Sequence, residues 1–398
     1  MRRARRAHLA ILLLRNISIL VKLNYVKRFH LSEKQAYCLH HSPMFKTYWN
    51  KLRRRFSNDI AIDLGTANTL VYVRGRGIVI NEPSVVAVNQ KTNQVVAVGS
   101  AAKEMLGRTP PHIIAVKPMV GGVISDFEVT EEMLAYLMRR AEGGQRAMLG
   151  PRVIVGVPAG VTNVETRAVR DATESRGARE VFLVDEAIAA AVGMRLPIKE
   201  PVGTMVVDIG GGTSDIVVIS MGGVVRSKGL KIAGDRFNND IISFVRSEYK
   251  VLIGEKTAEG LKIAIGSAMP QRELLQTAVR GRDIITGLPR EAVITDSDVR
   301  DALAPSLDIL LESIRGVLET TPPELVADIM HRGMYLVGGG ALLRGLDALI
   351  EEHMKIPVHI GEEPLTAVAR GAGVILERLD EFSDLLVEPD SNELPPPA

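Results

Sequence analysis

Two stretches of the chain share one alternation of apolar and polar positions. Residues 59–73 read DIAIDLGTANTLVYV and residues 204–218 read TMVVDIGGGTSDIVV. In each, an apolar run ends at an Asp, a short turn of small residues follows, and a second apolar run begins. Apolar runs bounded by Gly and Thr predict strands, so each stretch is expected to form two strands joined by a tight turn. Because the pattern occurs twice, it predicts two related domains.

Each repeat is followed by further apolar runs that lead into helical patterns. Residues 151–158 (PRVIVGVP) precede the helical pattern of residues 162–177, and residues 334–340 (MYLVGGG) precede that of residues 341–354. Strands that alternate with helices predict mixed α/β sheets flanked by helices.

The repeats also predict the domain boundaries. We expect a first domain over residues 57–202, a second over residues 203–385, and a disordered acidic, Pro-rich tail over residues 386–398. Residues 1–43 are basic and contain a short apolar run that is too short to span a bilayer. They are interpreted either as a real tail or as an artefact of an upstream start, and in both cases lie outside the fold.

Residues 44–56 (MFKTYWNKLRRRF) show helical spacing of apolar residues. Phe45, Trp49, Leu52 and Phe56 fall on one face, and most of the Lys and Arg residues lie elsewhere on the wheel. This pattern is typical of an amphipathic helix at a membrane surface. A terminal helix that packs on its own domain fits the pattern equally well.

Charge is distributed unevenly along the 398 residues. The net charge is only +2, yet residues 1–56 hold fourteen Lys and Arg against the single acid Glu33. The remainder is therefore acidic. Only 4% of residues are aromatic and no RNA-binding aromatic signature occurs, so anionic lipid is a better partner for the basic segment than nucleic acid. The lone Cys38 excludes an internal disulfide and fits a reducing, cytosolic compartment.

The turns of the two repeats suggest phosphate binding. A turn of small residues exposes backbone N–H groups that can hold phosphate oxygens, and a preceding Asp can hold Mg²⁺ directly or through water. Asp63 precedes one turn and Asp208 the other. Each turn alone is explained as a tight turn, but the pair suggests two loops that hold one triphosphate. The sequence contains no GxxxxGK[ST] motif, so a P-loop is excluded.

Two further features have competing interpretations. Gly338, Gly339 and Gly340 follow a predicted strand and could offer a flat surface to an adenine, or could serve close strand–helix packing. Thr162 and Glu165 form a capping-box pattern at a helix start, which explains both residues structurally. The carboxylate of Glu165 could instead face a cleft and position an attacking water.

Seven segments together carry a resemblance to a known family. They are IDLGTANTLVYV, GIVINEPSVVAV, MLGRTP, VVDIGGGTSDIVVIS, GDRFNNDII, TPPELVADI and LVGGGALLRGLD. From about Phe56 to about Leu379 the chain resembles MreB and Mbl, the bacterial actins. The resemblance implies the actin/Hsp70/sugar-kinase fold: two related domains with nucleotide between them, small subdomains at about residues 83–130 and 236–304, and weak ATPase activity with Mg²⁺.

The same resemblance implies partners and a location. It implies head-to-tail self-assembly into filaments on the anionic inner face of the cell membrane, in the cytoplasm. Membrane proteins of the cell-wall elongation machinery are the implied partners, and nucleic acid is not. Met148 and Leu149 resemble a membrane-inserting loop, although they could also cap the edge of the first domain.

Site residues follow from the matching motifs. The resemblance places the first phosphate loop at Thr66, Ala67 and Asn68, the second at Gly210, Gly211, Gly212 and Thr213, the nucleoside contacts at Glu259, Gly260, Leu261 and Lys262, and the adenine-side loop at Gly339, Gly340, Ala341 and Leu342. It makes Asp63 and Asp208 the Mg²⁺-organising residues, which contact the ion through water. It gives Glu165 the water-activating role.

The chain departs from the family pattern at four positions. Gly260 stands where Arg is usual, Asp215 replaces Glu, Ala187 replaces Pro and Thr166 replaces Arg. Gly260 bears on nucleotide preference, because it removes a guanidinium that could stack on the base. A soluble kinase of the same superfamily, which transfers phosphate to a small molecule, is the alternative function, since fold alone does not separate the two.

Overall fold

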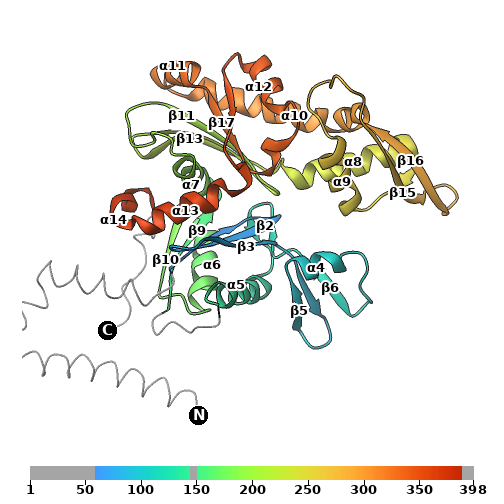
Figure 1. Ribbon diagram of the computed structural model, residues 1–398, viewed down its shortest axis with the longest axis horizontal. Helices are drawn as coiled ribbons and strands as arrows, with labels where there is room; N and C mark the ends of the chain where they lie inside the picture. The colour runs from blue at the N-terminus through green and yellow to red at the C-terminus, as the bar shows by residue number, and fades with distance from the viewer. Residues whose placement is uncertain (1–58, 144–149, 388–398) are drawn as a thin grey trace, which may run out of the picture. The chain divides into compact units, whose positions relative to one another are not determined.

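The computed structural model describes residues 59–143 and 150–387. Its first large sheet has the strand order β10-β9-β1-β2-β3 (Figure 1). The strands are β1 (Ile60–Leu64), β2 (Asn68–Val73), β3 (Gly77–Pro83), β9 (Arg152–Val157) and β10 (Glu180–Asp185). β1 pairs antiparallel with β2 and parallel with β9. The first repeat is thus a β-hairpin at the centre of a mixed sheet, as its pattern predicts.

The second large sheet repeats this arrangement, with the strand order β13-β12-β11-β17-β18. Its strands are β11 (Thr204–Ile209), β12 (Ser214–Ser220), β13 (Gly223–Leu230), β17 (Met334–Val337) and β18 (Val358–Ile360). β11 pairs antiparallel with β12 and parallel with β17, so it occupies the position that β1 has in the first sheet. The two Asp residues of the repeats therefore lie at equivalent places, Asp63 in β1 and Asp208 in β11.

We call the part of the chain that holds the first large sheet the first half, and the part that holds the second large sheet the second half. A smaller sheet is inserted into each half. The order β5-β4-β6 joins β4 (Val86–Asn89), β5 (Gln94–Val98) and β6 (Ile113–Val116). The order β14-β15-β16 joins β14 (Val251–Leu252), β15 (Gln276–Asp283) and β16 (Pro289–Thr295). A short hairpin pairs β7 (Met119–Val120) with β8 (Val123–Ile124). Both three-stranded sheets fall within the ranges expected for small subdomains.

Helices surround the sheets. In the first half they are α4 (Ser100–Met105), α5 (Phe127–Ala141), α6 (Asn163–Glu174) and α7 (Glu186–Gly193). In the second half they are α8 (Gly234–Tyr249), α9 (Glu255–Ile265), α10 (Asp296–Thr320), α11 (Pro323–Arg332), α12 (Leu346–Met354), α13 (Ala367–Glu377) and α14 (Leu379–Phe382). Short 3₁₀ turns are η1 (Gly339–Leu342), η2 (Pro364–Thr366) and η3 (Ser383–Leu385).

Helices α7 and α13 form a layer between the two large sheets. They pack on each other, α13 contacts β1, β2 and β9 of the first sheet, and α7 contacts β11 and β12 of the second. Figure 1 shows α13 crossing beside α7. The helices approach closely because Gly371 of α13 has no side chain: an added Cβ would lie 1.6 Å from the Ala189 oxygen. Although α13 falls in the range expected for the second domain, it packs on the first sheet.

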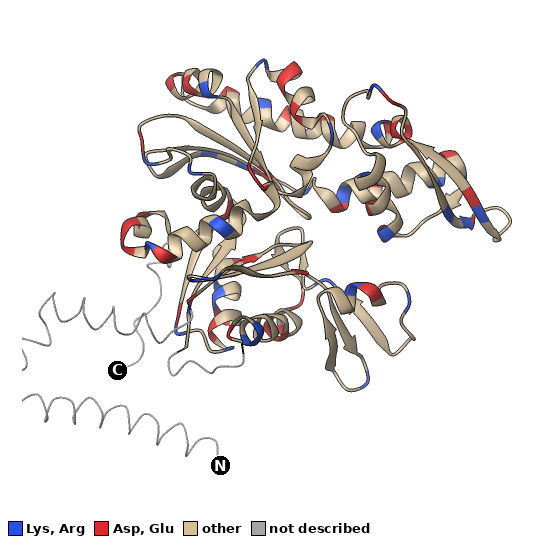
Figure 2. Ribbon diagram, in the orientation of Figure 1, with Lys and Arg blue, Asp and Glu red and all other residues tan. Residues whose placement is uncertain are grey.

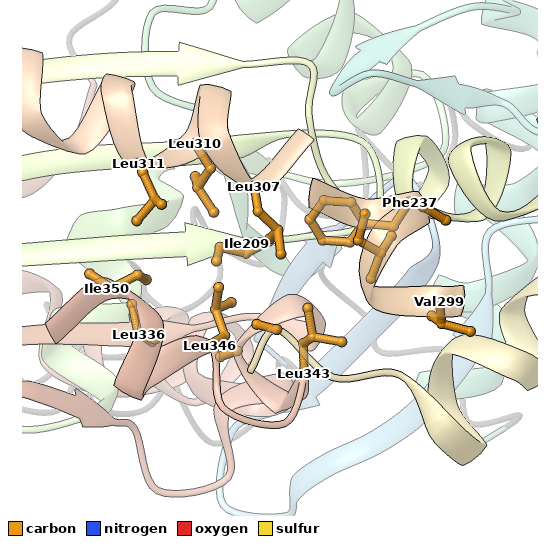
Figure 3. Close-up of a cluster of buried hydrophobic side chains, with 14 of the residues drawn as sticks. Ile209, Phe237, Val299, Leu307, Leu310, Leu311, Leu336, Leu343, Leu346 and Ile350 are labelled. Atoms are coloured by element: carbon orange, nitrogen blue, oxygen red, sulfur yellow. The ribbon is translucent and has the colours of Figure 1, made fainter. Parts of the chain in front are cut away.

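The second half has its own apolar core. Figure 3 shows Ile209 of β11 among side chains from α8, α10, β17 and α12, including Phe237, Leu307, Leu336 and Leu346. Charged side chains are spread over the helices and hairpins, whereas the strands of the large sheets are mostly uncharged (Figure 2). Burial on both faces explains why the strands of both repeats are almost continuously apolar.

The expected membrane elements, residues 44–56 and the loop with Met148 and Leu149, lie outside the described residues, as does the tail from residue 388. Within the described ranges, no helix is long and apolar enough to cross a bilayer.

Candidate functional site

A cavity of about 560 Å³ lies where the turns of the two repeats meet. From the first turn it is lined by Thr66, Ala67 and Asn68, from the second by Gly210, Gly211, Gly212 and Thr213, and from the strands before them by Asp63 and Asp208. The predicted residues Glu259, Lys262, Gly339, Gly340 and Leu342 also line it. Residues more than 270 positions apart in the sequence are therefore brought to one cavity.

The two turns touch each other because they are built from small residues. A Cβ added to Gly211 would lie 2.5 Å from the Cβ of Ala67, and one added to Gly212 would lie 2.5 Å from Oγ1 of Thr66. Larger side chains at either glycine would push the turns apart. The close approach leaves backbone groups of both turns to form the wall of the cavity.

A third element, the β7–β8 hairpin, reaches the same point. The Gly122 N–H donates a hydrogen bond of 3.1 Å to Oγ1 of Thr66 in the first turn. A Cβ on Gly122 would lie 2.9 Å from the Cγ2 atom of Thr213 in the second turn. This hairpin was not predicted from the sequence. Its Gly121-Gly122 pair, both with positive φ, was the available signal.

Buried carboxylates gather at the cavity, where Asp63, Asp208 and Glu186 line it. Burial, and then the charge of Asp208, raises the pKa of Asp63 to about 7. Burial and the charge of Asp185 raise the pKa of Asp208 to about 7, and burial followed by Asp208 raises the pKa of Asp215 to about 8. Burial, and next Asp63, raises the pKa of Glu186 well above its usual value. Like charges held in a low-dielectric site produce these shifts.

The carboxylates at the cavity determine whether a Mg²⁺ ion fits there. Among the described residues, no group of three or more His, Cys, Asp or Glu is arranged to hold a metal ion directly. Asp63 and Asp208 nevertheless both line the cavity and repel each other, so a divalent cation would relieve their repulsion. The residues fit a Mg²⁺ that keeps its waters and meets the carboxylates through them.

Helix α9 presents only part of its predicted motif to the cavity. Glu259, Lys262 and Ile263 line the cavity, whereas Leu261 is buried in the core of the second half. Gly260 is exposed, and a Cβ on it would meet no atom within 4 Å. The helical period of 3.6 explains why four consecutive residues cannot all face one ligand. Lys262 Nζ donates to the Gly234 oxygen (2.9 Å), and burial lowers the pKa of Lys262.

The Gly-rich segment after β17 packs closely on β11 and also lines the cavity. A Cβ on Gly340 would lie 2.1 Å from Cγ2 of Ile209, which is close packing, and Ala341 is fully buried. Gly339 and Leu342 line the cavity. The exposed side chains of Leu342, Ile263 and Leu365 add an apolar rim.

Glu165 lies in a capping box and is not among the residues that line the cavity. Its carboxylate accepts hydrogen bonds of 2.8 Å from both the Thr162 N–H and the Thr162 hydroxyl, and these bonds lower the pKa of Glu165. An acid at a helix start that does line the cavity is Glu186, in α7. Glu186 was not predicted, because Asp185 followed by Glu186 is typical of an ordinary acidic helix start.

Ion pairs connect the first half to the second beside the cavity. Lys117, between β6 and β7, lies 3.3 Å from Asp235 Oδ1 and 2.5 Å from Glu255 Oε1. Lys103 lies 3.0 Å from Glu259. Burial alone would lower the pKa of Lys117, but Glu255 and Asp235 outweigh it and raise that pKa. No sequence motif predicted these ion pairs, because they join residues that are far apart in the chain.

The paired sheets, with equivalent Asp–Gly turns converging on one cavity, define the class: this is an α/β protein of the actin/Hsp70/sugar-kinase fold. The family profile described as MreB/Mbl protein matches residues 57–384, and the chain belongs to the MreB/Mbl family of bacterial actin homologues. Both the fold class and the family predicted from the sequence are confirmed.

Known relatives cover most of the chain. It is 52% identical to the cell shape-determining protein MreB of Escherichia coli (strain K12), over 83% of this chain and 96% of the relative. It is 47% identical to the cell shape-determining protein Mbl of Bacillus cereus, over 82% and 98%. The crystal structure of MreB5 of Spiroplasma citri bound to ADP aligns with a TM-score of 0.79 at 38% identity, over 82% and 98%, and the structure of that protein bound to AMPPNP aligns equally well.

Proposed function

We propose that this protein binds ATP with Mg²⁺ in the cavity between the two repeats, hydrolyses it slowly, and assembles with itself into filaments. The filaments lie on the cytoplasmic face of the cell membrane and, with membrane proteins of the elongation machinery, organise cell-wall synthesis. The observation that carries the proposal is the convergence of both repeat turns on one cavity. Relatives named as cell shape-determining proteins, and MreB5 bound to ADP and to AMPPNP, support it.

In this proposal the backbone N–H groups of the two turns and the hydroxyls of Thr66 and Thr213 hold the phosphates. Bound Mg²⁺ would supply positive charge to the phosphate oxygens, and Asp63 and Asp208 would orient its waters. The apolar rim of Ile263, Leu342 and Leu365 would take the base, and Glu259 and Lys262, which also line the cavity, would lie beside the nucleoside.

Glu186 is the better candidate for positioning the attacking water. It lines the cavity and is buried beside Asp63 and Asp208, and burial followed by Asp63 raises the pKa of its carboxyl well above the usual value, which makes the carboxylate a stronger base. The Glu165 carboxylate accepts a hydrogen bond from the Thr162 N–H. We therefore propose that Glu186, rather than Glu165, activates the water.

Nucleotide binding and turnover are measured directly. A fluorescent ATP analogue should bind the purified protein with Mg²⁺, bind more weakly in EDTA, and be displaced by ATP. Phosphate should be released without any added acceptor. A soluble kinase of this fold would release little phosphate until a sugar or carboxylate acceptor is added, so acceptor-dependent turnover would favour that alternative.

A further inference from the structure

A second cavity, of about 1080 Å³, lies between the small sheet β5-β4-β6 and helix α5. It shares no lining residue with the site described above. Figure 1 shows β5 and α5 facing each other across this region. We call it the β5 groove.

The β5 groove is lined by the backbone edge of β5. Residues 93–98 line it without interruption. Successive side chains of a strand point to opposite faces, so an unbroken run of lining residues indicates that the edge itself borders the groove. Among the described strands, β5 pairs only with β4, so this edge is open.

The register shows which backbone groups are available. The Gly99 N–H donates to the Val85 oxygen at 2.9 Å. In the antiparallel ladder, Ala87↔Ala97 is therefore a hydrogen-bonded pair and Val86↔Val98 is not. The N–H and C=O of Val98 consequently point away from β4, toward the open edge.

The side chains around this edge are aliphatic on one wall and acidic on the other. Val88, Val96 and Ile114 belong to the sheet, and Val96 is 47% exposed. The groove carries the carboxylates of Asp126, Glu128, Glu131 and Glu132 and the guanidinium groups of Arg139 and Arg176, a net charge of −2. Arg176 is already paired with Glu131 at 2.8 Å and with Glu132 at 3.1 Å. Within the described part of the chain, the groove thus offers acid without an ion-pair partner to a basic ligand.

We propose that the β5 groove binds an extended segment of a partner protein, in which aliphatic residues alternate with Lys or Arg, as an added strand on β5. The main chain of the added strand hydrogen-bonds to the N–H and C=O of Val98. Its aliphatic side chains pack on Val96 and Ile114, and its cations pair with the carboxylate of Glu128. A helix would leave the edge groups unpaired. A second copy of this groove, or an anionic lipid, would bring like charges together.

The probe is a fluorescent peptide of three valines alternating with four lysines, flanked by serines. It is titrated against the full chain and followed by anisotropy. Two control peptides carry glutamate in place of lysine, or proline in place of the central valine. We expect the lysine peptide to bind at least about tenfold more tightly than either control, because charge and main-chain pairing both contribute. Equal binding of the glutamate or proline peptide would overturn the proposal.

Protein variants locate the site. Val98→Pro removes an outward N–H, and Glu128→Lys reverses a charge on the opposite wall without touching the sheet. Each should weaken binding of the lysine peptide about tenfold, whereas Glu352→Lys, at an exposed position of α12, should not. Thermal unfolding shows which variants are folded. If Val98→Pro is not folded, the binding of the lysine peptide to Glu128→Lys tests the site instead. Unchanged binding in folded Glu128→Lys, or stronger binding of a basic helical peptide than of the lysine peptide, would refute the added strand.

Discussion

Glu186 and Glu165 each lie at the start of a helix, but their carboxylates have different surroundings. Glu186 is buried in the cavity among Asp63, Asp208 and Asp215, whereas the Glu165 carboxylate closes a capping box with Thr162. A buried acid beside the proposed phosphate site can take a proton from water. The Glu165 carboxylate accepts two hydrogen bonds from Thr162, so it stabilises the first turn of its helix.

Substitution should separate these roles. Glu186→Gln keeps the shape of the side chain but cannot act as a base, so ATP should still bind while turnover falls by ~10²–10⁴-fold. Glu165→Ala should lower the free energy of unfolding by about 1 kcal/mol and leave turnover nearly unchanged. Phosphate release and chemical denaturation measure the two effects. Normal turnover in Glu186→Gln, with loss in Glu165→Ala, would return the role to Glu165.

The carboxylate cluster predicts a pH dependence. The pKa values of Asp63 and Asp208 are near 7 in the folded protein, against 3.8 for the ordinary side chain. Between these values the folded state holds protons that the unfolded state has lost, so stability is highest at low pH and falls as pH rises through about 7. In EDTA and without nucleotide, the melting temperature should fall from pH 5 to pH 8, and less steeply in Asp208→Asn. A melting temperature that rises over this range in both proteins would contradict the buried cluster.

Local patterns predicted much of the site, and long-range contacts account for the rest. Asp63, Asp208 and both turns were identified because each lies in a short segment with its own periodicity. Glu186 and the Gly122 hairpin were not, because their importance depends on what the fold places beside them. On α9, the motif marked residues 259–262 together, but the helical period turns Leu261 into the core and leaves Gly260 outside.

At the scale of elements, the contact between α7 and α13 joins the halves. Gly371 lies so close to α7 that a methyl group would meet the Ala189 oxygen, and a Cβ added to Gly193 of α7 would lie 2.2 Å from the Ala367 oxygen. Small residues at a helix crossing permit this approach, and overpacking there forces backbone shifts. The pattern of strands and helices predicted both sheets, but not that α13 would return to the first one.

Two glycine substitutions test this contact. Gly371→Ala should lower the free energy of unfolding by about 3 kcal/mol or more, since the new methyl group meets backbone atoms that cannot move freely. The matched control is Gly260→Ala, also within a helix but facing open space, which should stabilise by ~0.5–1 kcal/mol. Chemical denaturation measures both. If Gly371→Ala were as stable as the parent, the close crossing would be wrong.

At the scale of the whole molecule, the cavity is bounded by both halves. Lys117 and Lys103 connect the first half to α8 and α9 of the second, and the Gly122 hairpin touches both turns. A ligand held by both turns favours the arrangement in which they meet, so binding energy can select one relative position of the halves. In our proposed function, a head-to-tail contact that does not close into a ring would then grow a filament.

Membrane attachment is proposed to use the helix over residues 44–56 and the loop with Met148 and Leu149. Apolar side chains would insert, and Lys and Arg would add ~1 kcal/mol each near an anionic surface. With ATP, Trp49→Ala/Leu52→Ala and Met148→Ser/Leu149→Ser should each reduce co-sedimentation with anionic liposomes. Neutral liposomes are the control. Undiminished pelleting of both variants would remove both elements as anchors.

The central claim is that one cavity, built from two repeats, couples ATP to self-assembly. Sedimentation of the purified protein at micromolar concentration, with electron microscopy of the pellet, tests it most directly. We expect filaments to pellet with ATP and Mg²⁺, little pellet without nucleotide, and little with ATP for Asp208→Ala, which removes the cavity-lining aspartate of the second repeat. Equal pelleting of the parent with and without ATP, or a protein that binds ATP yet stays monomeric, would contradict the account.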